Sequence, residues 1–585
     1  MDRKKLFKFL NRHEKYIVTL ILLTLLVVSA NSIINKSVTW DERCYIGLGN
    51  YYLKTGNYNI DGFIYHGSLS YYLNSIFLVP LNLETDAWDK DRCWDISNDI
   101  IFNSDQDPKK IVFLSRLPFI FISLLLGFYV FKWAKELYGG AAGLFSLTLY
   151  AFSPGIIANS RFAMTDFPSI TFMFIALYYF WRSIKNDKNK YMIYAGIFVG
   201  LSLLSKFSGI FIFPIIFLLS LTKNKTLLIK RIIRIIQIGV IASLIIFIGY
   251  SFSLGTISSS LPDHYNTRVN EIIDDNFQGS LLKGVATFTY DKMIFPAPTY
   301  LAMVGDVIYS SVGGRKGYLL GQVTPNGEKP IYYFIVVFLV KSTLGFLILL
   351  LLSFIYFKNG KKSVIDELFL LVPAISTLII LSFNQFSFDL RHILLIYPLL
   401  FVFVGKLVNV KSKRQNLFYI SIVLLLAFHV ISSLSVYPNY VAYFNEIVSP
   451  DNGHEVLLGF NIDTGAELIN LKIYMDENDI DSLYLSYHGG VNPKNYGIDF
   501  EYLPSTHFQY WVPEYLHFKK DFSDVQEDCS AKQGLIAISV SNLKGRYLNN
   551  VSCYSWLEDH EPIERIGYSI FIYNITDESS TINQE

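Results

Sequence analysis

The sequence is poor in charged residues. Only 17% of its 585 residues are Asp, Glu, Lys or Arg, whereas soluble domains usually carry about 25%. The formal net charge is +1, so the chain lacks the overall basic field that attracts nucleic acid. Hydrophobic residues make up 52% of the chain, which excludes intrinsic disorder. We therefore expect neither a nucleic-acid-binding protein nor a string of soluble domains.

Most of the hydrophobic residues lie in long runs, and a helix needs about 20 such residues to cross a bilayer. The first run, 17–35, has no charged residue and follows a basic N-terminal segment. It is too long for the core of a cleaved signal peptide, which indicates a retained anchor. With ten further runs, the sequence predicts a polytopic α-helical membrane protein with about eleven transmembrane helices: 17–35, 111–130, 141–158, 167–181, 191–204, 209–221, 235–254, 331–356, 368–383, 393–404 and 417–436.

The basic residues of the short loops predict the orientation. If the N-terminus is cytoplasmic, every Lys- and Arg-rich short loop falls on the cytoplasmic side, as the positive-inside rule requires. The two long polar loops, 36–110 and 255–330, then lie outside the membrane. We expect a transmembrane domain over 1–436 and an extracytoplasmic domain over 437–585, with the plasma membrane as the location.

The segment after residue 437 has a different pattern. Short alternating runs at 482–487, 535–541 and 569–575 are typical of strands, and 468–478 is amphipathic with a helical period. The tail is therefore expected to be a small α/β domain.

Cysteine is scarce, with four residues that all fall on the predicted external side. Pairing within each region, Cys44 with Cys93 and Cys529 with Cys553, is the simplest of three arrangements. Free thiols are the alternative.

Carboxylates at external helix ends are the first candidates for chemistry. Asp41 and Glu42 follow the first span, and Asp166 opens the fourth. Such carboxylates can be solvated or can cap a helix. Alternatively, one of them acts as a general base that accepts a proton from a hydroxyl at the bilayer surface. His66, in an amphipathic stretch of the same first loop, is a further candidate.

Cations near the same ends could bind a phosphate, because arginine offers a bidentate fork and lysine a point charge. Lys341 lies deeper than the others, about 15 Å into its run at 1.5 Å per residue. Arg161 could pair with Asp166 or with a ligand phosphate. The candidates for substrate binding are Arg116, Arg161, Lys206, Lys341, Arg391 and, directly after Arg391, His392.

Motifs for a metal or a nucleotide are scarce. No His or Cys cluster has structural metal spacing, and no GxxxxGK loop is present. Asp89 and Asp91 form a D-x-D, but three residues in a charged loop are weak evidence. We predict no metal ligand and no certain cofactor; His66 near the acidic pair leaves a divalent metal as an open alternative.

Several short motifs occur in an order that resembles a known family. They include WDE at 40–42, SRLP at 115–118, SRFAMTD at 160–166, LLSKFSG at 203–209, VKSTLGF at 340–346, LRHILLIYP at 390–398, YPNYVAYFNE at 437–446 and NIDTGAEL at 461–468. Together they resemble the dolichyl-phosphate-mannose protein mannosyltransferases of the C-type (GT-C) superfamily of membrane glycosyltransferases.

The resemblance implies an inverting transferase that moves a sugar, most simply a mannose-like hexose, from a polyprenyl- or dolichyl-phosphate donor to an acceptor hydroxyl outside the membrane. The acceptor would be a protein, a lipid or a glycan. The resemblance implies that Asp41 is the base with Glu42 beside it, and that Asp166 is the second acid. It also implies that Arg391 and His392, with Lys206 or Arg116, hold the phosphate.

Two other functions are weighed against this one. An oligosaccharyl transferase would use a pyrophosphate-linked glycan, and no residue pattern separates it from a monophosphate enzyme. A transporter or flippase would place charges along a path through several spans. Here the deep charge is chiefly Lys341, and the other polar clusters lie on one face, which favours an enzyme.

Overall fold

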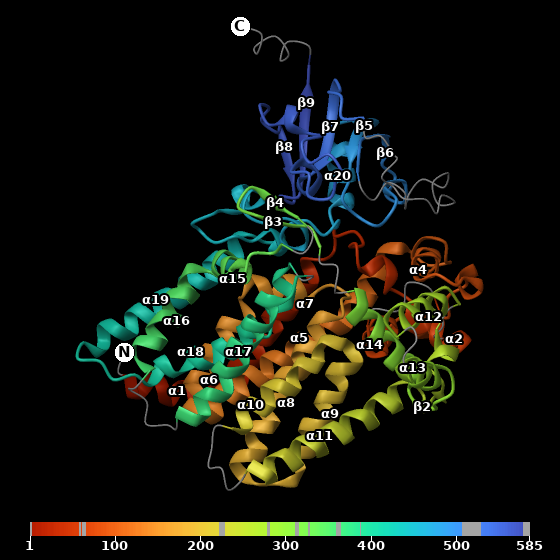
Figure 1. The fold of residues 1–585 in the computed structure, drawn as a ribbon. Helices are drawn as coiled ribbons and strands as arrows, with labels where there is room; N and C mark the ends of the chain where they lie inside the picture. Colours follow the sequence, from red (N-terminus) through yellow and green to blue (C-terminus); the bar gives the residue numbers. More distant parts are fainter. Residues whose placement is uncertain are drawn as a thin grey trace.

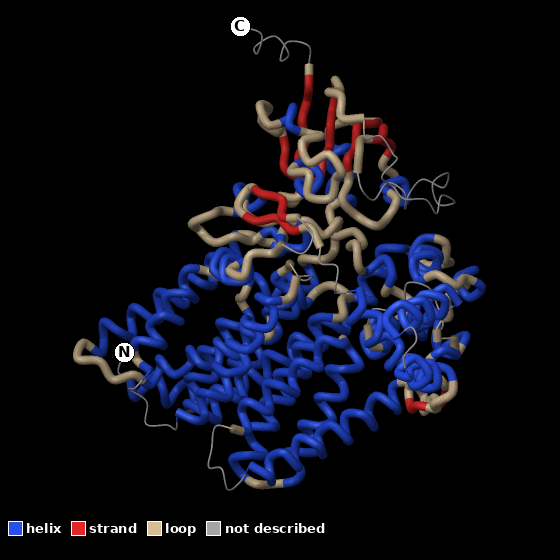
Figure 2. The backbone as a smooth tube through the Cα atoms, viewed as in Figure 1, coloured by secondary structure: helices blue, strands red, loops and turns tan. Residues whose placement is uncertain are grey.

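The computed structural model describes residues 3–57, 60, 66–221, 228–261, 263–277, 281–310, 315–325, 328–357, 364–385, 388–505 and 528–576. It consists of a body of long helices with a β-sheet standing at one end (Figures 1 and 2). Short helices and loops lie between the two parts, and candidate site residues come both from these connections and from the helices next to them.

Five helices are long and apolar enough to cross a membrane, by length and composition. Each begins or ends near a polar loop, and Pro118 and Pro373 are accommodated inside two of them. The chain is a multi-pass helical membrane protein. The five helices are α1 (Arg3–Asn31, with the apolar part at Arg12–Asn31), α5 (Pro108–Tyr138), α11 (Leu228–Gly249), α17 (Val364–Phe383) and α19 (Gln415–Ser435).

Two further spans are bent pairs, which raises the number to seven among the described residues if each pair crosses once. Helices α6 (Gly140–Ala151) and α7 (Pro154–Ser160) meet at 63°, because Pro154 starts a new helix. Helices α15 (Tyr333–Lys341) and α16 (Leu344–Ile355) meet at 113°, and Thr343 caps α16 by accepting from Phe346 N at 3.2 Å. The predicted run over 331–356 is therefore two helices and not one straight helix.

The remaining predicted runs also fall on helices. Helix α9 packs on α11 through small residues, because a Cβ on Gly196 or Gly200 would lie 2.8 or 2.6 Å from Ile241 or Ile245. The count of eleven spans stays a prediction. The helices on these runs are α8 (Asp166–Asn186), α9 (Asn189–Ser205), α10 (Ile212–Ser220) and α18 (Ile396–Val404).

The two long loops form short helices, most of which gather along one side of the helical body, at the right in Figure 1. The first loop contains η1 (Glu42–Cys44), α2 (Leu48–Thr55), α3 (Ser68–Ser75) and α4 (Cys93–Phe102). The second contains α12 (Asp263–Phe277), α13 (Leu281–Asp291), α14 (Pro298–Ser310) and two short hairpins, β1 (Leu254–Gly255) with β2 (Phe295–Pro296) and β3 (Gly317–Leu319) with β4 (Gln322–Thr324).

The tail contains a five-stranded mixed sheet in the order β6-β5-β7-β9-β8. The central strand β7 (Gly534–Ser539) pairs parallel with β5 (Ser482–Ser486) and antiparallel with β9 (Ile570–Ile575). Side chains on one face of these strands form a small separate core, whereas those on the other face of β7 and β9 join the main core. The predicted strands and the predicted helix are present. The other elements are β6 (Asp499–Tyr502), β8 (Glu564–Ile566), α20 (Leu468–Glu477) and α21 (Val540–Leu543).

Both disulfides of the simplest pairing are present, Cys44–Cys93 and Cys529–Cys553. The first joins η1 to the start of α4, directly after the Asp41–Glu42 pair. The second lies within the tail.

Candidate active site

Asp41 lies just before η1 and forms an ion pair with a residue 350 positions away. Its Oδ2 accepts from Nη1 of Arg391 in η8 (Leu390–Ile393). Nη2 of Arg391 also lies 3.5 Å from Oδ2 of Asp389, and the guanidinium packs 4.1 Å above the ring of Phe460. The Asp41 side chain is 18% exposed. Asp41 is therefore a paired carboxylate that solvent still reaches.

Asp166, the first residue of α8, forms a second pair beside the first. Lys206 Nζ donates to Asp166 Oδ1 at 2.6 Å, and His392 Nδ1 lies 4.0 Å from the same oxygen. Because His392 follows Arg391 in the chain, η8 contributes one residue to each pair. Four segments far apart in the sequence thus converge on one cluster of three carboxylates, Asp389 among them, and three basic side chains.

His66 is at the edge of this cluster. Burial, followed by the charge of Lys206, holds the pKa of His66 well below its ordinary value of 6.5. The ring meets Tyr45 edge-on at 5.4 Å between centroids, and its Nδ1 has no hydrogen-bond partner among the described residues. His66 is therefore a neutral imidazole next to the cluster, and this ring can donate or accept a hydrogen bond.

Glu42 has opposite surroundings to Asp41. Its carboxylate is fully buried and accepts from Nε and Nη2 of Arg116 at 2.9 and 2.7 Å, from Ala163 N at 2.8 Å and from Thr39 N at 3.0 Å. Burial alone would raise the pKa of Glu42, but Arg116 and these N–H groups hold it below its ordinary value. With its oxygens occupied in this way, Glu42 serves to fix the loop that carries Asp41.

Arg116, Arg161 and Lys341 bind backbone carbonyls. Arg116 donates to Lys36 O and Ser37 O at 2.7 Å each. Arg161 Nη1 donates to Ser32 O and Pro438 O at 2.8 Å each, and these bonds take the place of the predicted pair with Asp166.

Lys341 lies at the bend between α15 and α16. It donates to the carbonyls of Val441, Tyr443 and Asn461, and its Nζ lies 3.8 Å above the Phe444 ring. The sequence placed Lys341 roughly 15 Å into a straight span. The helix bends directly after Lys341, so this predicted depth does not hold.

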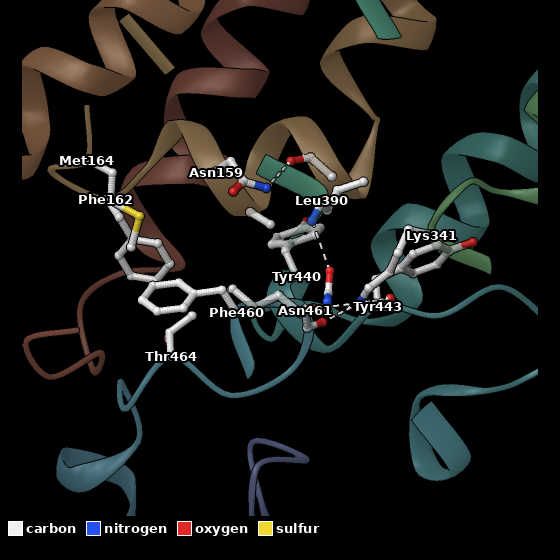
Figure 3. A pocket seen from close by; sticks show the side chains of 13 residues that line it. Asn159, Phe162, Met164, Lys341, Leu390, Tyr440, Tyr443, Phe460, Asn461 and Thr464 are labelled. Carbon is white, nitrogen blue, oxygen red and sulfur yellow. Dashed lines mark hydrogen bonds between the residues drawn. The ribbon is translucent and has the colours of Figure 1, made fainter. Parts of the chain in front are cut away.

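A small pocket lies next to the cluster (Figure 3). The rings of Phe162 and Phe460 lie together at one end of it, and Lys341 with Asn461 lies at the other. Phe460 also supports the guanidinium of Arg391. The pocket therefore shares a wall with the Asp41–Arg391 pair without including either residue.

Two charged residues of the site were not predicted from the sequence. Asp389 contacts Arg391, and Arg315 is close enough to interact electrostatically with Asp41 and Asp389. Asp389 directly precedes the motif at 390–398, which was the available signal for it, whereas Arg315 lies in GGRKG at 313–317, outside the motifs named above. Within the described ranges, no three His, Cys, Asp or Glu side chains gather as a metal site would require.

A family model connects the sequence with known enzymes. The model for dolichyl-phosphate-mannose-protein mannosyltransferase matches residues 112–251, a range that includes Arg116, Arg161, Asp166 and Lys206. The match confirms the resemblance indicated by the motifs: over this range the chain is similar to dolichyl-phosphate-mannose-protein mannosyltransferases. No curated protein matches the sequence.

Three solved structures are similar to parts or most of this chain. ArnT from Cupriavidus metallidurans, bound to undecaprenyl phosphate, has 11% identity over 95% of this chain and 97% of its own, with a TM-score of 0.48. AglB from Archaeoglobus fulgidus, an oligosaccharyltransferase solved with an inhibitory peptide and a dolichol-phosphate, has 12% identity over 98% and 75%, with a TM-score of 0.48. The S. cerevisiae Pmt1-Pmt2 complex has 17% identity over 41% and 33%, with a TM-score of 0.32. At these TM-scores the likenesses carry no argument about mechanism.

Proposed function

We propose that the protein is an inverting glycosyltransferase that takes a sugar from a polyprenyl- or dolichyl-phosphate and attaches it to a hydroxyl of a protein, lipid or glycan. The site faces outward, with the N-terminus in the cytoplasm and the tail as a separate extracytoplasmic domain, most simply at a plasma membrane. About eleven spans and a domain boundary near residue 436 belong to this proposal.

The observation that carries the proposal is the pair of neighbouring carboxylate–cation contacts, Asp41 with Arg391 and Asp166 with Lys206. A glycosyl transfer from a lipid phosphate needs a base for the acceptor and cations for the departing phosphate. Both kinds of group lie together here. Fixed cations aimed at developing charge are among the largest contributions to catalysis.

The reaction follows from the contacts. The acceptor oxygen forms a bond to the anomeric carbon while the bond from that carbon to the phosphate oxygen breaks, and the hydroxyl proton moves to Asp41. In the structure Arg391 holds Asp41. A donor phosphate that draws the Arg391 fork toward itself would leave Asp41 free to accept the proton. Donor binding would in this way activate the base.

Asp166, Lys206, His392 and His66 form the second half of the site. Lys206 and His392 supply a point charge and a hydrogen-bonding ring near the phosphate. Asp166 holds Lys206 through their ion pair, and its negative charge compensates the positive charge of Lys206. Arg116, Arg161, Glu42 and Lys341 act as positioning residues in this proposal, because their polar atoms contact the backbone or one another.

The test is sugar transfer by the purified chain in lipid with a panel of defined donors. We expect release of polyprenyl phosphate from a mannose-like monophosphate donor when an acceptor is present. Activity only with a pyrophosphate-linked glycan would favour the oligosaccharyl transferase alternative. Binding and movement of the lipid without bond cleavage would favour a flippase. Parallel reactions with EDTA and with added divalent cations test the need for a metal.

A further inference from the structure

The five residues before the catalytic loop, 36–40, form a buried segment between α1 and Asp41. Lys36, Ser37, Val38 and Thr39 are each at most 3% exposed. A position directly before the proposed base determines where that base lies. We call residues 36–40 the pre-catalytic segment.

One edge of the pre-catalytic segment is bonded to the tail. Ser37 N donates to Ala466 O at 2.9 Å, and Trp40 N donates to Thr464 O at 3.0 Å. Ser37 Oγ donates to Gly465 O and accepts from Leu468 N, at 3.1 Å each. Residues 463–468, which we call the docking segment, thus pair with the pre-catalytic segment along its length.

The side chains strengthen this contact. Lys36 forms an ion pair with Glu467, and both residues are buried. Glu467 also accepts from Asn470 Nδ2 at 2.6 Å, and Lys36 donates to Asn439 Oδ1 at 2.7 Å. A buried pair of this kind is costly to break on one side only, because the other charge is left uncompensated.

The docking segment is itself rigid. Gly465 has a φ of +76°, and a Cβ there would lie 2.9 Å from both Gly489 Cα and Tyr487 Oη. Its carbonyl also accepts from Tyr487 Oη at 2.5 Å, and its N donates to Asp463 Oδ1 at 3.2 Å. The tail therefore presents a preformed edge to the pre-catalytic segment.

The opposite edge is bonded to the membrane body, because Arg116 of α5 donates to the carbonyls of Lys36 and Ser37. Ser37 is thus bonded to the tail through its N and to α5 through its O. The segment before Asp41 is clamped between the two parts of the molecule.

We propose that these contacts give the tail a positioning role in catalysis. The docking segment, through Glu467 and its backbone carbonyls, holds Asp41 in position for proton transfer. The inference rests on the proposed function and gives the tail a role within it. Glu467 and Ser37 are positioning residues that touch neither substrate nor reacting atoms. A shift of about 1 Å in a reacting group can cost roughly 100-fold in rate.

The test compares two independent variants with a control. Ser37→Ala removes two hydrogen bonds and keeps the ion pair, whereas Glu467→Gln weakens the ion pair and keeps the bonds of Ser37. Glu455→Gln is the control, because Glu455 pairs with Lys544 at 2.8 Å in the tail, away from the pre-catalytic segment. We expect kcat to fall roughly tenfold or more in both test variants, with the donor KM changed less than about threefold, and no change in the control.

Hydrogen exchange over residues 37–46 supplies a readout that does not depend on activity. We expect faster exchange there in both test variants than in the control. Unchanged kcat and unchanged exchange would overturn the proposed positioning role of the docking segment. A loss of activity that only follows the fraction of folded protein would overturn it too. If the unmodified chain transfers no sugar from any donor, the proposed function fails, while the exchange result still decides whether the tail fixes this loop.

Discussion

Two adjacent carboxylates, Asp41 and Glu42, have different tasks because their partners differ. Glu42 is fully buried and bonded to Arg116 and two backbone N–H groups. Asp41 is partly exposed and contacts Arg391, a group that a phosphate could attract. A base must be able to change partners during the reaction, and of the two only Asp41 meets this requirement.

A third acid, Asp463, makes the stability of the protein depend on pH. Burial raises its pKa from 3.8 to about 7. Between these values the folded chain holds a proton that the unfolded chain has lost, so stability falls as the pH rises from about 4 to about 7 and then levels off. We expect the thermal midpoint to be lower at pH 8 than at pH 5, and Asp463→Asn to reduce this difference. The exposed Asp481→Asn is the control; an unchanged pH profile in Asp463→Asn would contradict the assignment.

The sequence could nominate these residues but could not separate their roles. Asp41, Asp166, Lys206 and Arg391 stand at the ends of apolar runs, and charge is rarely placed there without a purpose. The partner of Glu42 is 74 positions away, and such pairings arise only from the packing of helices. For the same reason Arg116 and Lys341 could be taken for phosphate ligands, although they bind carbonyls.

At the level of elements, the loop that carries Asp41 is fixed from three sides. Arg116 attaches it to α5, the docking segment attaches it to the tail, and the Cys44–Cys93 disulfide attaches η1 to α4. Ser97 of α4 adds a bond from its Oγ to Ile46 O at 2.6 Å. A loop held in this way gives a base a defined position without a long rigid helix of its own.

This arrangement predicts that the two disulfides differ in importance. Replacing Cys44 and Cys93 together by Ser should lower the thermal midpoint and also kcat, because η1 loses its attachment to α4. A native disulfide typically contributes about 2–4 kcal/mol. The matched variant with Cys529 and Cys553 replaced should keep kcat near that of the unmodified chain. Equal loss of kcat in both variants, measured on folded protein, would contradict the role of the first disulfide.

For the whole molecule, long apolar runs were sufficient to predict the helices, because backbone groups in lipid must bond within a helix. The alternating runs likewise predicted strands β5, β7 and β9. The bend of 113° after Lys341 was not predictable. It depends on carbonyls of Val441, Tyr443 and Asn461, which the Lys341 ammonium finds only in the folded chain.

The orientation of the molecule gives a prediction of its own. All four cysteines of the sequence form disulfides, so a single introduced cysteine can be labelled selectively. In intact cells a membrane-impermeant maleimide should label Asp481→Cys in the tail but not Lys413→Cys in the loop before α19. After the cells are opened, both should react. The reverse pattern in intact cells would contradict the outward-facing tail.

The central claim is that Asp41 accepts the proton of the acceptor during sugar transfer. The most direct measurement is the rate of transfer from a polyprenyl-phosphate sugar by Asp41→Asn. The control is Asp89→Asn, an exposed carboxylate of the same long loop. An asparagine keeps the shape of the side chain and removes its basicity. The account predicts that Asp41→Asn is folded and membrane-inserted but loses transfer by about 100-fold or more, while Asp89→Asn transfers normally. Full transfer by Asp41→Asn would contradict the claim.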